Sequence, residues 1–417
     1  MPYIKRISDS ELQRKLNSSG AVLIRGAKAC GKTESAKQFA SSILNVDQDE
    51  QVPVLMETSP QRLLLGKTPR LIDEWQEYPK LWNYIRHEID NRKQTSQFIL
   101  TGSANPEESI KMHSGAGRFT TLDMRTMAWQ ELGFSSGKIS MKTLFDGTKI
   151  DVYDEPTELE FIVEKIIIGG FPTLLGKNIN QAIDLNRAYI DLLAEVDMSR
   201  VSNMKRDPVK VRNLLRSLAR NTATMADITT LESDIYEKEN SDISRPTIYE
   251  YLDALNRLMM LEEQPAWNTH IRSSSSLRKA PRRHFTDVAL SVAAIGANKK
   301  SLLADLHFTG FLFESLVIHE LRVYAQANDA KVYHYRDSSN LEIDAIVQKY
   351  NGEWIAFEIK LGTGQIEEAA ASLNKLVSIL DNQKVQSPKS LNIITGTGIS
   401  YTRKDGINVI SLASLGA

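Results

Sequence analysis

The sequence predicts an α/β protein with three parts: a parallel-sheet domain, a mostly helical middle and a C-terminal α/β domain. Short apolar runs alternate with helical patterns in the first part, apolar residues recur at helical spacing in the middle, and the last part mixes a helix with strand-like runs. The chain has 417 residues, of which 41% are hydrophobic, and a single core rarely grows past about 250–300 residues. We therefore expect domains at residues 1–150, 151–290 and 291–417.

In the first domain we expect strands at residues 21–25, 52–56, 69–73, 97–101 and 118–124, with helices at 32–44 and 79–91. Alternation of strands and helices implies parallel pairing, with helices on both faces of the sheet. Between residues 133 and 155, the Gly, Ser and Asp content is typical of a linker or a loose helical connection.

In the middle, residues 208–221 and 225–235 have helical patterns, and a third helix is expected to start at Ser244, a good N-cap, with Pro246 in its first turn. Residues 259–267 then become strand-like. Three helices followed by a hairpin is the order of a winged helix-turn-helix. In the tail we expect a helix at 311–323 and strands at 331–335, 341–349, 354–360 and 391–395.

Charge and cysteine content exclude several classes of protein. Lysine plus arginine (51) nearly balances aspartate plus glutamate (52), so only a local basic patch could indicate a polyanionic partner. One cysteine excludes an intrachain disulfide framework and a multi-thiolate zinc site. We see no signal-peptide h-region and no run near the ~20 apolar residues that span a bilayer, and we expect a cytoplasmic protein without a membrane partner.

The stretch GAKACGKT fits the phosphate-loop pattern G-x-x-x-x-G-K-[ST], with an apolar strand before it and an amphipathic helix after it. Glycines let backbone N–H groups curl round phosphate oxygens. We expect Lys32 to reach the β- and γ-phosphates of ATP and the Thr33 hydroxyl to bind Mg²⁺. Cys30 is a small filler rather than a nucleophile, because no base is identifiable near it. The predicted nucleotide-binding residues are Gly26, Ala27, Lys28, Ala29, Cys30, Gly31, Lys32 and Thr33.

Three further segments supply candidate partners for this loop. Asp73 ends the third expected strand and is predicted to hold the magnesium hydration shell, while Glu74 orients and polarises the attacking water. In the run FILTGS, Thr101 and Ser103 are candidates to sense the γ-phosphate. Arg118 is a candidate to stabilise phosphate charge, in cis or from a neighbouring subunit, which would require a homo-oligomer. The alternative for Arg118 is an ordinary surface arginine.

In the tail, four residues occur in the order of a PD-(D/E)-x-K nuclease core. Glu314 lies on the expected helix, Asp344 on one strand, and Glu358 and Lys360 on the next, where a spacing of two places them on one face. The carboxylates of Glu314, Asp344 and Glu358 would bind Mg²⁺, and Lys360 would help to activate water for phosphodiester hydrolysis. The alternative is the ordinary alternation of charged and apolar residues on a half-exposed strand.

Taken together, the motifs GAKACGKT, LIDEWQEYP and FILTGSA, the GR before FTTLDM, and GGFP resemble AAA-type P-loop ATPases of bacteria and archaea. The resemblance covers most of the chain. It implies a winged-helix-like middle and a restriction-endonuclease-like tail, in a domain of unknown function. The stretch MRTMAWQELG departs from the proline- and serine-containing pattern usual in that family.

Nucleic acid is the partner that these features favour, although the basic residues give a mixed signal. The helix after Ser244 would present Arg245, Thr247 and Tyr249 to DNA, but acidic residues share that surface. A second group, spaced by serines, makes a better polyanion patch: Arg272, Lys279, Arg282 and Arg283. The alternative for this group is a solvated loop. We therefore expect an ATPase coupled to a DNA- or RNA-binding and cleaving tail. The alternatives are a nucleotide-dependent switch for a protein partner, with an inactive nuclease-like tail, and a tail that serves for dimerisation.

Overall fold

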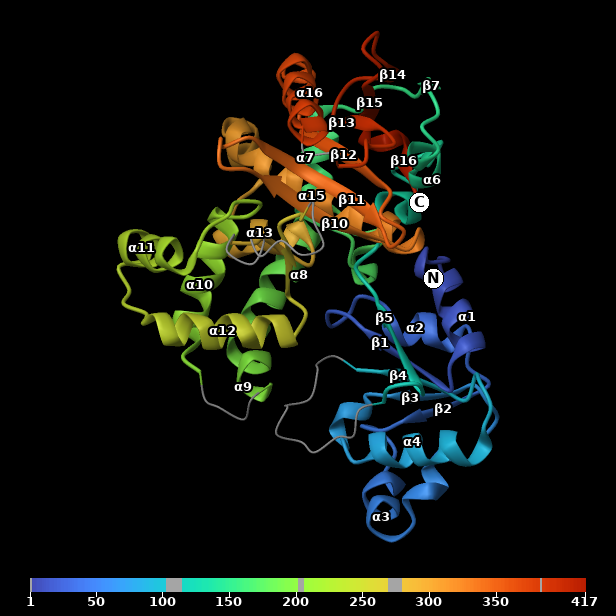
Figure 1. Ribbon diagram of the computed structural model, residues 1–417. Helices are drawn as coiled ribbons and strands as arrows, with labels where there is room; N and C mark the ends of the chain where they lie inside the picture. Colours follow the sequence, from blue (N-terminus) through green and yellow to red (C-terminus); the bar gives the residue numbers. More distant parts are fainter. Residues whose placement is uncertain (1, 103–114, 202–205, 269–279, 383–384) are drawn as a thin grey trace.

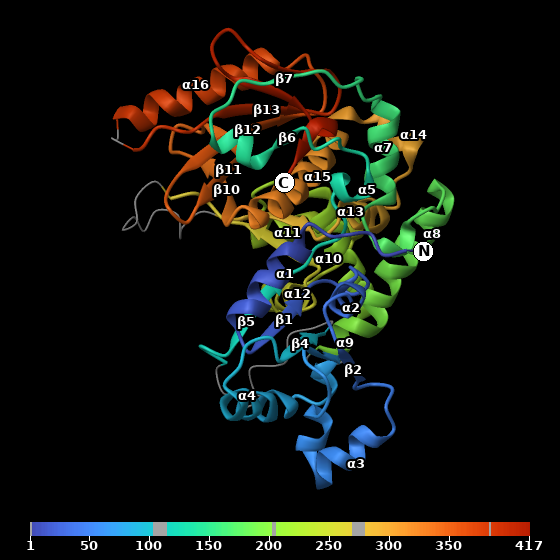
Figure 2. The same cartoon turned by 90° about the vertical axis from the view of Figure 1, so that its right-hand side faces the viewer.

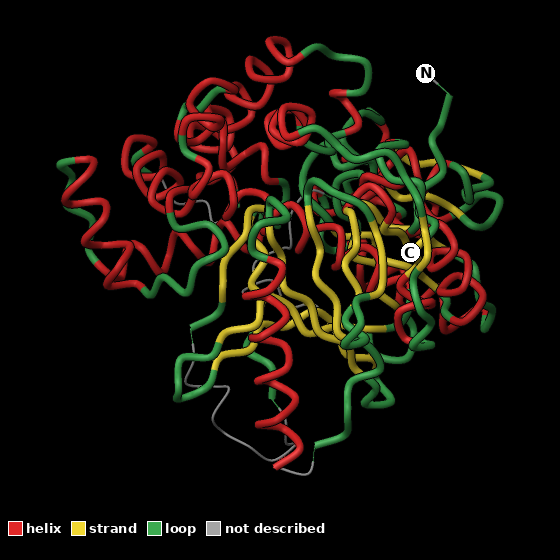
Figure 3. Tube along the Cα trace, turned by 90° about the horizontal axis from the view of Figure 1, so that it is seen from above, coloured by secondary structure: helices red, strands yellow, loops and turns green. Residues whose placement is uncertain are grey.

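The computed structural model describes residues 2–102, 115–201, 206–268, 280–382 and 385–417, and these form three parts (Figure 1). The N-terminal sheet domain lies at the lower right of Figure 1, the helices of the middle at the lower left, and a mixed sheet at the top. Figure 2 shows that helix α1 (Ser8–Ser18) lies between the N-terminal sheet and the mixed sheet. Seen from above in Figure 3, the helices of the middle lie to the left of the strands.

The N-terminal sheet has five parallel strands in the order β2-β3-β4-β1-β5. One face is covered by α1 and α2 (Lys32–Lys37), where Leu12 and Leu16 pack with Val22 and Ile24. The other face is covered by α3 (Gln51–Thr58) and α4 (Leu81–Arg92). The strands are β1 (Ala21–Arg25), β2 (Ser42–Asn45), β3 (Arg70–Asp73), β4 (Phe98–Thr101) and β5 (Phe119–Asp123). The expected strands near residues 21, 69, 97 and 118 are confirmed.

Two expectations in this domain are wrong. The helix expected over residues 32–44 ends at Lys37, and its last residues form β2, which pairs with β3. The strand expected over residues 52–56 is helix α3 instead. Pro53 lies in the first turn of this helix, where a missing N–H costs nothing. Only Val52 is buried in α3, while Val54 is 62% exposed. A short apolar run does not distinguish a strand from a helix. The second strand of the sheet was therefore expected at residues 52–56, whereas it lies at Ser42–Asn45.

The middle is helical and ends in a two-stranded antiparallel hairpin. The three helices and the hairpin expected here are confirmed, and Ser244 caps its helix by accepting from the backbone N–H of Thr247. The elements are α7 (Leu159–Ile168), α8 (Ile179–Leu192), α9 (Met198–Arg200), α10 (Pro208–Arg220), α11 (Ile228–Glu239), α12 (Arg245–Arg257), β8 (Leu261–Gln264), β9 (Arg282–Phe285) and α13 (Val288–Ile295).

The tail is built on a mixed sheet in the order β10-β11-β12-β13-β15-β14-β7. Helix α15 (Leu306–Ala327) packs on one face and α16 (Ile366–Asn382) on the other. The expected helix and four strands are confirmed. The remaining elements are α14 (Lys299–Ala304), β10 (Ala330–Arg336), β11 (Glu342–Lys349), β12 (Trp354–Lys360), β13 (Leu391–Thr395), β14 (Ser400–Thr402), β15 (Asn408–Ser411) and β16 (Leu415–Gly416). Among the described residues, no helix combines the length and apolarity that crossing a membrane requires.

The segment after the N-terminal domain is part of the tail rather than a loose connection. After the short helix α5 (Trp129–Leu132), strand β6 (Ile139–Ser140) pairs with β16, helix α6 (Met141–Phe145) follows, and β7 (Asp151–Val152) pairs with β14. Trp129, Met141 and Phe145 pack in the same core as α15. These contacts run across the boundary expected at residue 150.

Candidate nucleotide site and candidate metal centre

The phosphate loop joins the end of β1 to the start of α2, at the carboxyl edge of the parallel sheet. Ala29 and Gly31 have φ angles of 63° and 104°, so the loop curls through the left-handed region that favours glycine. Gly26 lies against backbone, because a Cβ at this position would be 2.1 Å from the carbonyl oxygen of Met124. The loop therefore rests directly on the segment that leaves β5.

Lys32 lies over this curled backbone. Its ammonium donates to the carbonyl oxygens of Gly26 and Ala27, at 2.9 Å in both cases, and the residue is 6% exposed. Lys28 of the same loop points outward instead, and its Nζ lies 3.4 Å from Asp197. Of the two lysines, Lys32 is thus the one held over the loop.

Hydroxyl and carboxylate oxygens meet beside the loop. Strands β3 and β4 pair so that Asp73 lies opposite Thr101, both at the carboxyl end. The Thr33 hydroxyl donates to Asp73 Oδ1 at 2.9 Å, and the Thr101 hydroxyl donates to the same oxygen. Such oxygen donors suit Mg²⁺. Ser103, the other candidate sensor, lies outside the described residues.

Glu74 is held by a residue that the sequence reasoning missed. Its φ of 53° is in the left-handed region, which is uncommon for a side chain of this kind. The Gln76 amide donates to the Glu74 carboxylate. Gln76 in turn packs against Gly102, where a Cβ would lie 2.2 Å from Gln76 Oε1. The backbone turn and this amide together direct Glu74, which follows Asp73 at the same edge of the sheet.

Arg118 lies at the opposite edge of the sheet from the phosphate loop. It precedes β5, whose first residue pairs with Ala21 at the start of β1, whereas the loop follows the end of β1. Five strand residues separate these two edges by about 16 Å. Arg118 Nε lies 2.6 Å from Asp90 on α4, at the surface. A contact with phosphate in cis does not fit this placement, so only the role in a neighbouring subunit stays as a prediction.

Replacing Arg118 with alanine tests that role. In an oligomer that uses Arg118 as a finger, Arg118→Ala should lower ATP turnover by about 10³-fold or more with ATP affinity unchanged. Turnover and nucleotide affinity should be measured over a range of protein concentrations. The matched control is Arg14→Ala, which removes another exposed arginine in an ion pair, that with Asp329. Full turnover in Arg118→Ala would leave it an ordinary surface residue.

The N-terminal segment braces the loop through Arg6, a second residue that sequence reasoning missed. The buried Arg6 guanidinium donates to the carbonyl oxygen of Cys30 at 3.0 Å and to those of Arg125 and Thr126 at 2.8 and 3.1 Å. Its Nε lies 3.1 Å from Glu131. Most of these partners belong to MRTMAWQELG, the stretch in which the sequence departs from the family pattern. No spacing signal connects this arginine to the loop.

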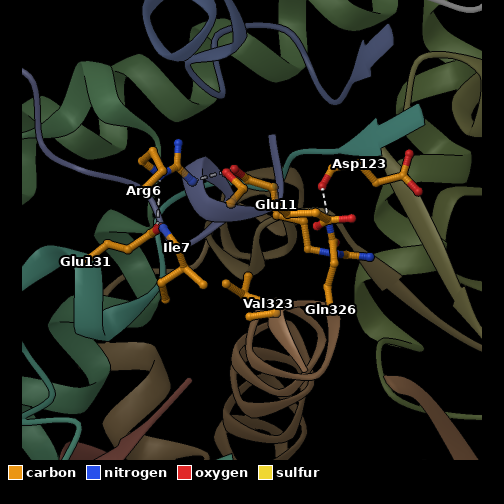
Figure 4. A pocket seen from close by; sticks show the side chains of 10 residues that line it. Arg6, Ile7, Glu11, Asp123, Glu131, Val323 and Gln326 are labelled. Atoms are coloured by element: carbon orange, nitrogen blue, oxygen red, sulfur yellow. Dashed lines mark hydrogen bonds and ion pairs between the residues drawn. The ribbon is translucent and has the colours of Figure 1, made fainter. Parts of the chain in front are cut away.

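The same stretch contacts the tail around a small pocket of about 20 Å³ (Figure 4). In Figure 4, Arg6 and Glu131 point toward each other, and Gln326 of α15 reaches Glu11 and Asp123. The Gln326 amide donates to the Glu11 carboxylate and to the Asp123 carbonyl oxygen, at 2.8 Å in both cases. Helix α15 is therefore bonded directly to the N-terminal domain.

A three-way ion pair lies next to this pocket. Arg125, just beyond β5, makes a bidentate contact with Glu262 of β8, at 2.8 to 3.0 Å. Arg322 of α15 lies 3.6 Å from the same carboxylate. Burial raises the pKa of Glu262, but the two arginines outweigh it and lower this pKa to about 2. One carboxylate thus joins all three parts of the chain.

The GGFP turn also joins the parts. The Gly170 carbonyl oxygen accepts from the Met127 N–H at 2.7 Å, and a Cβ at Gly170 would lie 2.3 Å from the Met127 oxygen. Asp287 accepts from the Gly170 N–H at 2.8 Å and from the Ala289 N–H at 3.0 Å. Asp287 therefore caps α13 and also holds the GGFP turn.

In the tail, the four predicted residues converge into what we call the carboxylate cluster: Glu314, Asp344, Glu358 and Lys360. The Lys360 ammonium lies 2.8 Å from Glu358 and 3.6 Å from Asp344. Asp344 also accepts from the Ile359 N–H at 2.9 Å. Glu314 reaches the cluster from α15. Glu358 and Lys360, two residues apart on β12, thus lie on one face of the strand, as expected.

Burial and charge set the proton affinities in the carboxylate cluster. Burial, followed by the nearby Asp344 charge, raises the pKa of Glu314 to about 8. The same two causes raise the pKa of Glu358 well above its usual value. Burial acts on Asp344 in the same direction, but Lys360 and Arg282 outweigh it and lower the pKa of Asp344. Glu314 and Glu358 thus hold a proton more tightly than an ordinary glutamate, and Asp344 holds one less tightly than an ordinary aspartate.

Arg282 lies in the carboxylate cluster, and its expected place in an exposed basic patch is wrong. It was expected to face a polyanion, but its side chain is 5% exposed and its guanidinium lies 2.6 Å from Glu314 and 3.4 Å from Asp344. Arg283 is also engaged, by Glu263 and by the Ala226 carbonyl oxygen. Arg272 and Lys279 lie outside the described residues.

The metal predicted for the carboxylate cluster does not fit this arrangement. A cation already lies between Glu314 and Asp344, and a second one, Lys360, lies against Asp344 and Glu358. In the part of the chain that is described, no group of three or more His, Cys, Asp or Glu residues is arranged to hold a metal ion.

The helix expected to face DNA has its charges engaged within the middle. Arg245 of α12 pairs with Glu232 of α11 at 2.8 Å, and Glu250 pairs with Arg206 at 3.2 Å. Tyr249 is 62% exposed on the same helix. The hairpin β8–β9 lies against the tail, where the Gln264 amide donates to the carbonyl oxygens of Tyr333 and Asp344. The described part of this hairpin therefore packs against the tail through Gln264.

The sheet order, the phosphate loop and the Asp73 contacts define the class of the first domain, and sequence comparison agrees with them. Residues 18–133 match the family described as AAA domain. The N-terminal part of this chain is an AAA-type ATPase domain. Residues 159–301 and 309–415 match two families, each described as a domain of unknown function (DUF8612 and DUF4143).

Two similar proteins are uncharacterised proteins of Mycobacterium tuberculosis and Mycobacterium bovis. Each is 22% identical over 361 residues, which cover 85% of this chain and 74% of the relative. Among solved structures, a Walker-type ATPase of Pyrococcus abyssi aligns with a TM-score of 0.43 and 12% identity, over 70% of this chain and 96% of that one.

Proposed function

We propose that this protein binds ATP with Mg²⁺ and hydrolyses it at the phosphate loop. The observation that carries the proposal is the meeting of two hydroxyls, from Thr33 and Thr101, on the Asp73 carboxylate beside that loop. These groups come from three separate elements. Their convergence at the carboxyl edge of a parallel sheet is what magnesium-dependent nucleotide chemistry requires.

Each residue has one task in this proposal. Lys32 binds the β- and γ-phosphates, and Thr33 and Asp73 hold the ion directly or through its water shell. The magnesium ion, when bound, supplies neutralisation of the phosphate charge. Glu74, directed by Gln76, orients the attacking water and accepts its proton.

Removing the ammonium over the loop tests the binding step. Lys32→Ala should weaken ATP binding by about 10-fold or more, because a charge-assisted contact to phosphate is worth roughly 1.5–3 kcal/mol. Affinity should be measured by titration with a fluorescent ATP analogue. Lys37→Ala is the matched control, since Lys37 lies at the end of α2, outside the loop, and pairs with Glu34 at the surface. Equal affinity in Lys32→Ala and the wild type would contradict the assignment.

We further propose that the nucleotide state is relayed to the middle and the tail, and that the tail acts on DNA or RNA. Support for the relay comes from the stretch on which the loop rests. The Thr126 hydroxyl lies 3.0 Å from His319 Nε2, and the Trp129 N–H donates to Glu320 at 2.9 Å, both on α15. The convergent carboxylate cluster supports a nuclease-like tail.

The second candidate is a nucleotide-dependent switch that acts on a protein partner through a tail without cleavage activity. The buried Arg282 favours it, because this guanidinium occupies the cluster where hydrolysis would need an ion. ATP turnover should be measured with and without DNA and RNA, followed by inspection of the nucleic acid. Stimulation with cleavage supports the first candidate; neither effect supports the second.

A further inference from the structure

We propose that Arg282 is a built-in cation that holds the carboxylate cluster closed, so that a divalent ion binds there only when the guanidinium has left. The proposal concerns the tail and does not depend on ATP hydrolysis. It goes beyond the proposed function, because it assigns control of the cluster to a residue of the middle hairpin.

Arg282 contacts several carboxylates at once, as a bound metal cation would. One guanidinium nitrogen lies 2.6 Å from Glu314 and 3.4 Å from Asp344, and the other lies 2.8 Å from Glu342. The buried carboxyl groups of Glu314, Asp344 and Glu358 lie in one place and repel one another when charged, and cations relieve that cost. Lys360 lies against Asp344 and Glu358, and the cation that pairs with Glu314 is Arg282.

This guanidinium is delivered from another part of the chain. The carboxylates come from α15, β11 and β12, whereas Arg282 begins β9 of the hairpin. Its Nε is buried and has no hydrogen-bond partner within the described part of the chain. The guanidinium is thus held through its two terminal nitrogens, which face the carboxylates of the tail.

The hairpin that carries Arg282 is also anchored to the ATPase domain. In the β8–β9 pair, Gln264 lies opposite Arg282. Glu262 is two residues before Gln264 on the same strand, so it lies close to Arg282 in the hairpin. Glu262 holds Arg125, which immediately follows the Met124 backbone on which the phosphate loop rests. The paired strands β8 and β9 thus have one charged contact with the ATPase domain, through Glu262, and another inside the tail, through Arg282. A shift of the first contact would move the second.

Binding of Mn²⁺ alone, by the full-length protein without nucleotide, tests the proposal. We compare the wild type with Arg282→Gln and with the matched control Arg283→Gln, the neighbour that pairs with Glu263 instead. Bound Mn²⁺ is counted by equilibrium dialysis, and thermal unfolding is followed with and without the ion. Any ion held near the phosphate loop is common to all three proteins and cancels in the comparison.

Arg282→Gln should bind about one Mn²⁺ per chain more than the wild type and the control. The carboxylate oxygens of the cluster would be the ligands, as is usual for hard divalent ions. Its unfolding temperature should fall without the ion and recover with it. Adding Asp344→Asn should abolish both effects. If Arg282→Gln folds and gains no ion, or if the wild type already loses a bound ion upon Asp344→Asn, the proposal is overturned.

A milder variant keeps the test decisive if Arg282→Gln does not fold. Glu342→Gln removes a half-exposed carboxylate that holds one side of the guanidinium, and it leaves Glu314, Asp344 and Glu358 intact. This variant should bind Mn²⁺ measurably but more weakly than a protein without Arg282. Absence of any gain in Glu342→Gln would then overturn the proposal.

Discussion

Replacing Glu74 with glutamine is expected to slow ATP hydrolysis by about 10²–10⁴-fold, the usual contribution of general base catalysis. Glutamine keeps the size of the side chain and its amide oxygen can still accept from Gln76, so the local geometry is retained. It cannot take a proton from the attacking water. ATP binding should therefore stay close to that of the wild type, because Lys32 and Thr33 are untouched.

Single-turnover hydrolysis with excess protein measures the chemical step directly, and a parallel titration gives the ATP affinity. Glu77→Gln is the matched control, since Glu77 is exposed on the same short turn. Equal hydrolysis rates in Glu74→Gln and Glu77→Gln would show that another group activates the water.

Replacing Glu262 with glutamine should cost about 3 kcal/mol of folding free energy, because it leaves the partly buried Arg125 and the buried Arg322 without their shared anion. Burial lowers the pKa of Arg322 to about 10, so this guanidinium is already in an unfavourable place. The carboxylate has a folded-state pKa of about 2, below its usual value of 4.5. It therefore stabilises the fold above pH 4.5, and this stabilisation is lost as the pH falls toward 2.

Thermal unfolding between pH 7 and pH 2 measures both effects. Glu262→Gln should unfold at a lower temperature at pH 7, and its unfolding temperature should depend less on pH in the acid range. Glu263→Gln serves as the control, because this neighbouring carboxylate is 45% exposed and pairs with Arg283. Identical unfolding temperatures for the two variants at pH 7 would mean that the three-way ion pair adds nothing to stability.

Elements with strong local signals could be predicted from the sequence. The phosphate loop, the strand ending at Asp73 and the helix capped by Ser244 each have their signal within a few residues. Strand β2 and helix α3 could not be predicted, because a short apolar run fits both a strand and a helix. Pairing with β3 determines which segment becomes the strand. Strand periodicity likewise placed Glu358 and Lys360 together correctly.

Contacts between distant residues could not be predicted in the same way. Arg6 contacts Cys30 and Arg125, far along the chain, and nothing in its neighbours points there. Arg282 was interpreted as part of an exposed basic group, because adjacent serines and arginines favour a solvated loop. On strand β9 its side chain instead points into the tail, while that of Arg283 points away. A single sequence does not show on which side of a strand a distant partner lies.

The pairing of β6 and β7 with the tail sheet has a consequence for how the chain is made. Ile139 of β6 pairs with Leu415, near the last residue of the sequence, and Val152 of β7 pairs with Ser400. During synthesis, the ATPase domain can fold as soon as it emerges, but Trp129, Met141 and Phe145 must wait for the rest of their core. Such non-local closure is slow, and it exposes apolar surface to chaperones and proteases in the meantime. A chain without β16 would leave part of this apolar surface uncovered around Ile139.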